Sequence, residues 1–158
     1  MEIRKILPAD NLQMAAIVRN VLMEMGAPTI GTAYADPNLD TLHETYNHAR
    51  AVYYVLVNGD TVVGGAGVSQ LENAEPTICE FQKMYFLPEA RGLGFARKIL
   101  DLCLQDAISF GYKKCYIETM PYMHDAQKLY KNAGFYNLDN PLGNTGHTSC
   151  EVWMMKDL

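Results

Sequence analysis

The sequence lacks the features that mark membrane and secreted proteins. No segment approaches the ~20 consecutive apolar residues that a membrane-spanning helix needs. The first residues, Met1 to Pro8, contain no long apolar region and no small-residue cleavage site, so they are not typical of a secretion signal. The sequence therefore predicts a protein located in the cytoplasm, with no membrane partner.

Cysteine motifs and an excess of positive charge are also missing. The cysteines form no C-x-x-C pair and no cysteine–histidine zinc pattern, and the histidines share no ligand spacing on one helix face. We therefore expect no metal site, and buried, reduced thiols at Cys79, Cys103, Cys115 and Cys150. With 13 Lys and Arg against 18 Asp and Glu, the net charge is −5, and no basic run with interleaved aromatic residues occurs. A nucleic-acid partner is not expected.

What is present is typical of one globular domain, spanning residues 1–158. Hydrophobic residues make up 49% of the chain and charged residues 20%, and the length is sufficient for one hydrophobic core. Alternating and helical periodicities predict a mixed α/β domain. The predicted strands are 2–6, 51–57, 61–68, 78–86, 114–119, 135–136 and 150–155, and the predicted helices are 10–25 (capped by Asp10), 39–49, 94–110 and 123–133. The glycines between Gly64 and Gly67 predict a bulge or a close backbone approach.

The most informative segment is Arg91-Gly92-Leu93-Gly94-Phe95-Ala96, between the 78–86 strand and the 94–110 helix. The first N–H groups of a helix have no internal partner, and the helix dipole is positive there. Glycine allows a close backbone approach, so the segment favours an anion such as phosphate or pyrophosphate, with Arg91 adding positive charge. A tight turn that only packs helix on strand is the alternative. A P-loop is absent, and the third glycine of a dinucleotide fingerprint is missing.

A second segment, Ala126-Gln127-Lys128-Leu129-Tyr130-Lys131-Asn132-Ala133-Gly134-Phe135, follows at the penultimate helix. Taken together, the two segments resemble the GNAT superfamily of acyl-CoA-dependent N-acyltransferases. The first matches the family's [QR]-x-x-G-x-[GA] signature, and the second matches its A-x-x-L-Y-x-x-x-G-F run. The resemblance covers essentially the whole chain. It implies a GNAT fold: a central, mostly antiparallel sheet of six to seven strands with one splayed strand pair, flanked by about four helices.

The resemblance also implies acetyl-CoA as cosubstrate. The backbone of the strand residues Met84, Tyr85 and Phe86 would pair with the pantetheine amides, and Arg91 with the amides of Gly92, Leu93, Gly94, Phe95 and Ala96 would hold the pyrophosphate. One position departs from the family pattern. Met123 stands where the family often has Asn, so that cofactor contact is absent or is made by His124 or Asp125.

The implied reaction is direct attack of a neutral amine on the acetyl thioester in a ternary complex. Tyr130 matches the family tyrosine that donates a proton to the leaving thiolate, although it could instead be a buried packing residue. Glu80, a charged residue in an apolar strand, is the first candidate for the base, and Glu118 on the next strand is its rival. Either carboxylate could instead be solvated or paired with a cation, and many family members use no fixed base.

Residues 22–50 and 137–149 are expected to choose the acceptor. The first segment combines aromatic residues with acids such as Asp36, and the second is polar and contains His147. This mixture suits a cation with some apolar surface: a small amine, a polyamine or an amino-acid-like molecule. The alternatives are a peptide or protein acceptor, or a non-catalytic acyl-CoA-binding or sensor module. A homodimer is compatible with the resemblance.

Overall fold

One seven-stranded sheet runs through the whole chain, in the order β1-β2-β3-β4-β5-β7-β6. The computed structural model describes residues 1–158. The strands are β1 (Glu2–Lys5), β2 (Val52–Asn58), β3 (Thr61–Gln70), β4 (Ile78–Phe86), β5 (Lys114–Thr119), β6 (Tyr136–Leu138) and β7 (Val152–Asp157). All neighbouring strands are antiparallel except β4 and β5, which are parallel. The sheet therefore has one parallel pair, and it lies at the centre of the strand order.

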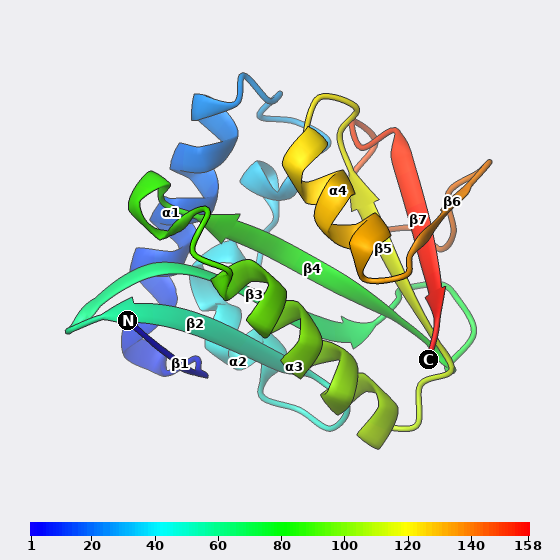
Figure 1. The fold of residues 1–158 in the computed structure, drawn as a ribbon, viewed down its shortest axis with the longest axis horizontal. Coiled ribbons are helices and arrows are strands. Elements are labelled where there is room, and N and C mark those ends of the chain that lie inside the picture. The colour runs from blue at the N-terminus through cyan, green and yellow to red at the C-terminus, as the bar shows by residue number, and fades with distance from the viewer.

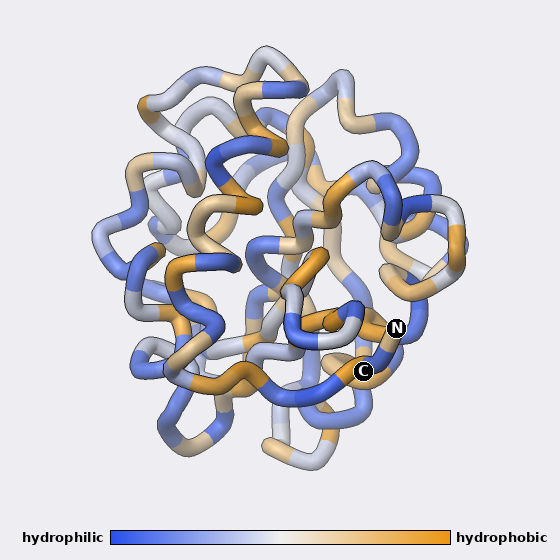
Figure 2. The backbone as a smooth tube through the Cα atoms, turned by 90° about the vertical axis from the view of Figure 1, so that its left-hand side faces the viewer, coloured by the Kyte–Doolittle hydropathy of each residue, from blue (hydrophilic) through white to orange (hydrophobic).

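Helices cover both faces of the sheet (Figure 1). They are α1 (Asn11–Glu24), α2 (Leu42–Tyr46), α3 (Phe95–Ser109) and α4 (His124–Asn132). One buried core joins α3 and α4 to the sheet, and a second joins α1 and α2 to the opposite face. The apolar positions of α3 produce the first core, because Ile99, Leu100, Cys103 and Ala107 recur at helical spacing and are fully or almost fully buried. Figure 2 shows hydrophilic and hydrophobic residues alternating along the coiled segments. The predicted mixed α/β fold with seven strands and four helices is confirmed.

Two local expectations were wrong. Asp10 does not cap α1 with its side chain; instead, its carboxylate accepts from the Leu7 N–H at 2.7 Å and pairs with Arg4 at 2.6 Å. This happens because the 3-10 turn Pro8–Asp10 precedes α1 and Asp10 itself has near-helical torsions. The helix expected over 39–49 is a 3-10 turn followed by the short α2. Thr41, with φ −134° and ψ 43°, lies outside the helical region and separates the two.

The glycine-rich centre of β3 faces a bulge in β4. Gly65 pairs with Tyr85 and Gly67 with Gln82, so two residues of β4, Lys83 and Met84, lie opposite one residue of β3. Lys83 takes the left-handed φ of 52°, which is rare for a residue with a side chain. A Cβ on Gly64, Gly65 or Gly67 would collide with aromatic rings or strand carbonyls, so the close approach predicted for this segment is confirmed.

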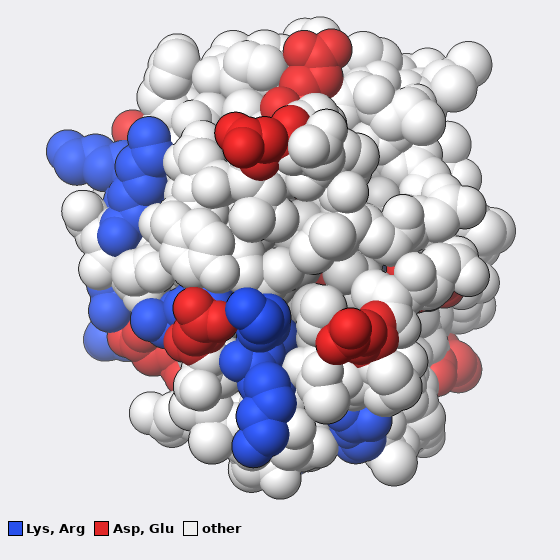
Figure 3. Space-filling model, turned by 90° about the vertical axis from the view of Figure 1, so that its right-hand side faces the viewer, with Lys and Arg blue, Asp and Glu red and all other residues white.

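The four cysteines are free and buried, as the sequence predicts. No helix combines the length and the apolar character that crossing a membrane would require. Figure 3 shows the side of the molecule that carries β6 and β7, where acidic and basic side chains lie interspersed on a largely uncharged surface. No single sign of charge dominates this face.

Candidate active site

The parallel strands β4 and β5 separate near the middle of the sheet and leave a wedge. They pair only over Ile78–Glu80 and Lys114–Tyr116, although β4 continues to Phe86 and β5 to Thr119. The Lys83 bulge lies shortly beyond the last paired residue and turns β4 aside. Backbone groups of the second half of β4 that face β5 have no strand partner there, so a ligand with amide groups can pair with them.

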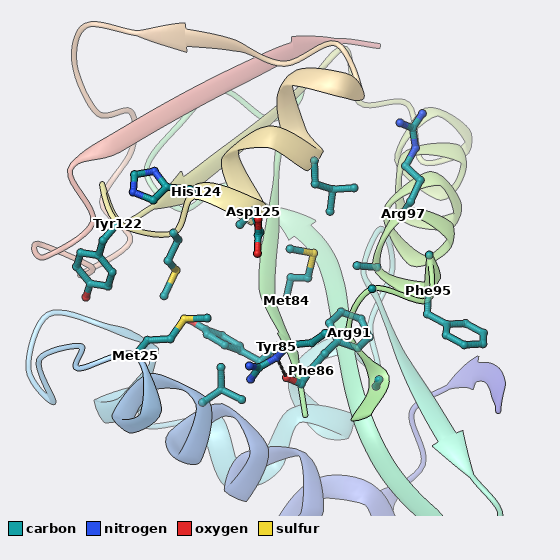
Figure 4. Close-up of a pocket in the computed structure, with 18 residues that line it drawn as sticks. Met25, Met84, Tyr85, Phe86, Arg91, Phe95, Arg97, Tyr122, His124 and Asp125 are labelled. Carbon is teal, nitrogen blue, oxygen red and sulfur yellow. Dashed lines mark hydrogen bonds between the residues drawn. The ribbon is translucent and has the colours of Figure 1, made fainter. Parts of the chain in front are cut away.

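A cavity of about 760 Å³ lies at the open end of the wedge, within the size range of ligand sites. Its lining is mainly apolar and comes from α1, β4, the glycine turn, the start of α3, the segment before α4 and α4 itself: Val21, Met25, Met84, Tyr85, Phe86, Ala90, Arg91, Gly92, Gly94, Phe95, Ala96, Arg97, Tyr122, Met123, His124, Asp125, Ala126 and Leu129. Figure 4 shows Met25, the residue after α1, and Tyr122 at one end, and Phe95 and Arg97 of α3 at the other. The cavity thus connects a helix N-terminus with an apolar chamber.

The glycine turn leaves its backbone N–H groups free. Gly92 and Gly94 have φ of 72° and 80°, and a Cβ at either position would meet nothing within 4 Å. The first helical hydrogen bond of α3 runs from the Lys98 N–H to the Gly94 carbonyl, and no side chain caps the helix. The N–H groups of residues 92–97 have no acceptor in the chain. Unpaired donors at the positive end of a helix dipole suit an anionic ligand, and the turn that carries them lies on the cavity wall.

The Arg91 guanidinium is already engaged. Both terminal nitrogens pair with the Glu24 carboxylate at 2.8 Å, and Nε donates to the Phe86 carbonyl at 2.8 Å. The Phe86 bond is drawn in Figure 4. The pair joins the end of α1 to the glycine turn, and Glu24 balances the charge expected to attract the phosphate. In this conformation the unpaired N–H groups, not Arg91, are the free anion-binding groups.

Tyr130 lies in the core between α4 and the sheet rather than in the cavity wall. Its ring packs edge-on against Phe81, with centroids 6.2 Å apart, and beside Phe135 at 6.0 Å. Burial raises the pKa of its hydroxyl, so the group keeps its proton at any physiological pH. Its α4 neighbours Ala126 and Leu129 do line the cavity. The hydroxyl can therefore act as a proton donor, but only to a ligand that enters deeper than the cavity.

Glu80 is 4% exposed and no cation pairs with it. Gln82 donates to its carboxylate at 2.5 Å, and the Tyr46 hydroxyl holds the other end of the Gln82 amide at 2.6 Å. Burial raises the pKa of Glu80 to about 7; the Gln82 hydrogen bond opposes this shift and the negative charge of Glu118 adds to it. A carboxylate that titrates near neutrality can take up and release protons in the cell. Glu80 does not line the cavity.

Glu118, the rival candidate, has partners at both carboxylate oxygens. The Tyr116 hydroxyl donates at 2.7 Å and the Thr145 hydroxyl at 2.6 Å. Glu118, His147 and Cys150 bring potential metal-ligand atoms within 4.8 Å of one another, a grouping that the sequence spacing did not indicate. Two of the three already have protein partners: Glu118 accepts from the two hydroxyls, and His147 is bonded to Asp36 at 2.9 Å. The absence of a metal site stays a prediction.

Sequence reasoning missed Lys83 and Gln82. A signal was present: Glu80 and Gln82 follow the period of two that a strand requires, and Lys83 breaks it, which is typical of a bulge. Lys83 and His147 meet at Asp36, and no local pattern could have indicated this contact.

The Acetyltransferase (GNAT) family profile matches residues 20–135, which is most of the chain. The chain belongs to the GNAT acetyltransferase family. It is 41% identical over 156 residues to the uncharacterized N-acetyltransferase YjgM of Escherichia coli (strain K12), covering 98% of this chain and 93% of that protein. The resemblance inferred from the two sequence motifs is confirmed, and the protein is an acyltransferase of this family.

Solved structures of GNAT proteins share the fold. An acetyltransferase of the GNAT family from Staphylococcus aureus Mu50 superposes with a TM-score of 0.86 at 18% identity, covering 99% of this chain and 98% of that one. A GNAT superfamily phosphinothricin acetyltransferase from Sinorhizobium meliloti, solved in complex with acetyl-CoA, gives 0.78 at 19% identity, covering 99% and 88%. In the chain described by the present structure, Met123, His124 and Asp125 all line the cavity. Met123, the residue that departs from the family pattern, therefore lies at the candidate site.

Proposed function

We propose that this protein transfers an acetyl group from acetyl-CoA to a primary amine. The observation that supports this most is a single cavity that joins the unpaired N–H groups of the glycine turn to the wedge between β4 and β5. A ligand with an anionic group at one end and amide groups along its middle fits these two features. Bound acetyl-CoA would supply an acyl group activated as a thioester.

The proposed cofactor contacts are mostly backbone. The amides of Gly92, Leu93, Gly94, Phe95 and Ala96 would bind the pyrophosphate, and the main chain of Met84, Tyr85 and Phe86 would pair with the pantetheine. Arg91 would hold the turn in shape through Glu24 and the Phe86 carbonyl, because its guanidinium is committed to these two partners. The open space above Gly92 and Gly94 fits a ligand that lies directly on the backbone.

In the proposed mechanism, Tyr130 donates a proton to the departing thiolate. Its raised pKa keeps it protonated, and its place on α4, beside two cavity-lining residues, puts it at the inner end of the wedge. Glu80 is the proposed base. Because its pKa is about 7, a large fraction is ionised at neutral pH, and it would accept the ammonium proton through water, since it lies behind the cavity wall. Glu118 is the alternative base on the neighbouring strand.

The proposed acceptor is a small amine, polyamine or amino-acid-like molecule. Two carboxylates without an ion-pair partner support a cationic guest: Glu118 and Glu80 both lie close enough to Cys150 to raise the pKa of its thiol. A peptide or protein amine is the alternative acceptor. The free, buried thiols fit the reducing cytoplasm as the location. A homodimer stays a prediction that light scattering of the purified protein would check.

Thermal unfolding with and without acetyl-CoA tests the cofactor proposal. A ligand 100-fold above its Kd stabilises the folded protein by about 2.7 kcal/mol, which for a chain of this length raises the midpoint by about 5–10 °C. Free CoA should give most of this rise, because the proposed contacts are to its pyrophosphate and pantetheine. An unchanged midpoint at saturating acetyl-CoA would refute the cofactor proposal. A rise would be followed by an amine screen that detects released thiol.

A further inference from the structure

Three charged side chains from distant parts of the chain meet on the sheet face that carries α1 and α2. Asp36 follows the 3-10 turn Ala33–Ala35 in the connection between α1 and α2, Lys83 is in the bulge of β4, and His147 is in the connection between β6 and β7. Lys83 Nζ lies 2.7 Å from one Asp36 oxygen and His147 Nε2 lies 2.9 Å from the other. Their side chains are between 10% and 19% exposed. We call these three residues the clasp.

Asp36 is the centre of the clasp because each of its oxygens serves one cation. Burial raises the pKa of Asp36, but the His147 hydrogen bond and the charges of Lys83 and His147 more than offset this, and the pKa falls to about 2. Replacing the carboxylate would leave two buried cations facing each other without a shared anion. Buried ion pairs add little net stability, but they can fix one arrangement of the chain.

The connection between α1 and α2 and the connection between β6 and β7 also contact each other outside the clasp. The Ser149 N–H donates to the Gly31 carbonyl at 2.9 Å, and the Ser149 hydroxyl donates to the Ile30 carbonyl at 3.2 Å. Gly31 packs so closely that a Cβ would lie 2.9 Å from the Ser149 hydroxyl oxygen. These contacts are short-range backbone and hydroxyl bonds at the surface. The clasp is the charged, buried part of the same junction.

The junction lies beside the carboxylates of the wedge. Thr145, two residues before His147, donates to Glu118 at 2.6 Å, and potential ligand atoms of Glu118 and His147 lie within 4.8 Å. Glu80 is close enough to His147 to raise its pKa. The two connections are also the segments expected from the sequence to choose the acceptor. The clasp therefore fixes their position relative to the groups proposed to handle the acceptor's proton.

We propose that Asp36 is a positioning residue for the acceptor: through Lys83 and His147 it holds the 27–36 and 139–149 segments together over Glu80 and Glu118. The inference rests on the proposed function, but the contacts of the clasp are all made within the chain. Asp36 acts through the two cations and does not touch reacting atoms. Its loss should loosen the two segments and weaken acceptor binding, and leave the glycine turn and acetyl-CoA binding unchanged.

The clasp should depend on pH. Burial lowers the pKa of His147, but the hydrogen bond and charge of Asp36 outweigh this and the pKa is raised above 6.5. The stabilising charge of His147 is thus fully present below pH 6.5 and is lost as pH rises through the raised value. The Asp36 charge is present above pH 3.8 and is lost as pH falls toward 2. The titratable groups that face His147 are Asp36, Lys83, Glu80, Glu118 and Cys150, and the charges of Asp36, Lys83 and Glu80 contribute to its pKa.

Hydrogen exchange on the ligand-free protein tests the clasp directly. The reporter is the Ser149 amide, which bonds to Gly31 across the junction. Asp36→Asn should speed its exchange by about tenfold or more, as expected for loss of a 1.4 kcal/mol constraint on local opening. The matched control is Asp40→Asn, the same change in an exposed ion pair with Arg19, which should exchange like the wild type. Wild-type exchange in Asp36→Asn would overturn the proposal.

A second variant changes His147, one of the two cations of the clasp. His147→Gln removes the cation and keeps a neutral donor, so it should loosen the same amide less than Asp36→Asn does. If both variants exchange faster, the acceptor KM found in the amine screen should rise several-fold for Asp36→Asn, while the midpoint rise with acetyl-CoA equals that of the wild type. A wild-type KM with faster exchange would also overturn the positioning role. Failure of the cofactor proposal would appear separately, as no midpoint rise in the wild type.

Discussion

Replacing Glu80 with Gln should make the protein more stable, and increasingly so as pH rises. The wild-type carboxyl is 4% exposed and forms no ion pair, and burial raises its pKa from 4.5 to about 7 although the charges of His147 and Lys83 oppose the rise. Between these two values the unfolded chain has lost the proton while the folded chain keeps it. The contribution of Glu80 to the free energy of unfolding therefore falls as pH rises from 4.5 to about 7, and it is constant above that pH. The glutamine of the variant cannot ionise and should not show this loss.

The size of the effect follows from the same two values. Raising the pKa from 4.5 to about 7 costs about 3 kcal/mol of stability at alkaline pH, because a tenfold change in an equilibrium constant is about 1.4 kcal/mol. At pH 5 the unfolded carboxyl is already mostly ionised, so about 1 kcal/mol of that penalty is present and about 2 kcal/mol more appears between pH 5 and pH 8. The introduced glutamine keeps an oxygen that can accept the Gln82 hydrogen bond, so little else changes.

Urea unfolding at pH 5 and pH 8 measures the difference between variant and wild type at each pH. The variant's advantage should grow by about 2 kcal/mol between the two pH values. Glu151→Gln, at an exposed carboxylate, controls for the loss of one negative charge. A Glu80→Gln difference that is the same at both pH values would show that Glu80 ionises like an exposed carboxyl. The raised pKa, and with it the argument for Glu80 as a base, would then be refuted.

The remaining predictions concern the cofactor turn and the acid. Gly94→Ala and Gly111→Ala both force a side chain into positive φ in open space, so both should cost about 1–2 kcal/mol of stability. Only Gly94→Ala should also abolish the midpoint rise with acetyl-CoA, because Gly111 lies at the far end of α3; equal rises in both variants would contradict binding at the turn. Tyr130→Phe should lower turnover about 100-fold or more and keep the acetyl-CoA midpoint rise, whereas Tyr136→Phe, at an exposed tyrosine on β6, should match the wild type. An unchanged rate in Tyr130→Phe would end the general-acid role.

Much of the fold could be predicted from the sequence because its signals are local. The alternation of β2 and the helical spacing of α3 each reflect one buried face, and both elements are found within one residue of their predicted bounds. Where the sequence misled, a neighbouring contact outweighed the local preference. Asp10 was free to cap α1 in isolation, but Arg4 and the Leu7 N–H provide stronger partners. The helix expected over 39–49 was divided at Thr41, whose backbone leaves the helical region.

The candidate site divides in the same way. The glycine turn could be recognised in the sequence because its proposed role, anion binding, depends on the backbone of consecutive residues. Its unpaired N–H groups follow from a helix that begins at Phe95. The pairing of the Arg91 side chain with Glu24 could not be predicted, since Glu24 is 67 residues away and nothing in the hexapeptide indicates it. The position of Glu80 on a strand was predictable, whereas its nearly complete burial without a cation was not.

The family, the element order and the anion-binding turn could all be inferred from the chain alone, because each depends on residue types at short, fixed spacings. The folded arrangement was needed to establish which charges are paired, which carboxyl has a raised pKa and where the segments proposed to choose the acceptor meet. Lys83 and His147 are joined through Asp36, and His147 is 111 residues from it. Contacts over such separations depend on how the strands and connections pack together, and they leave no periodic signal in the chain.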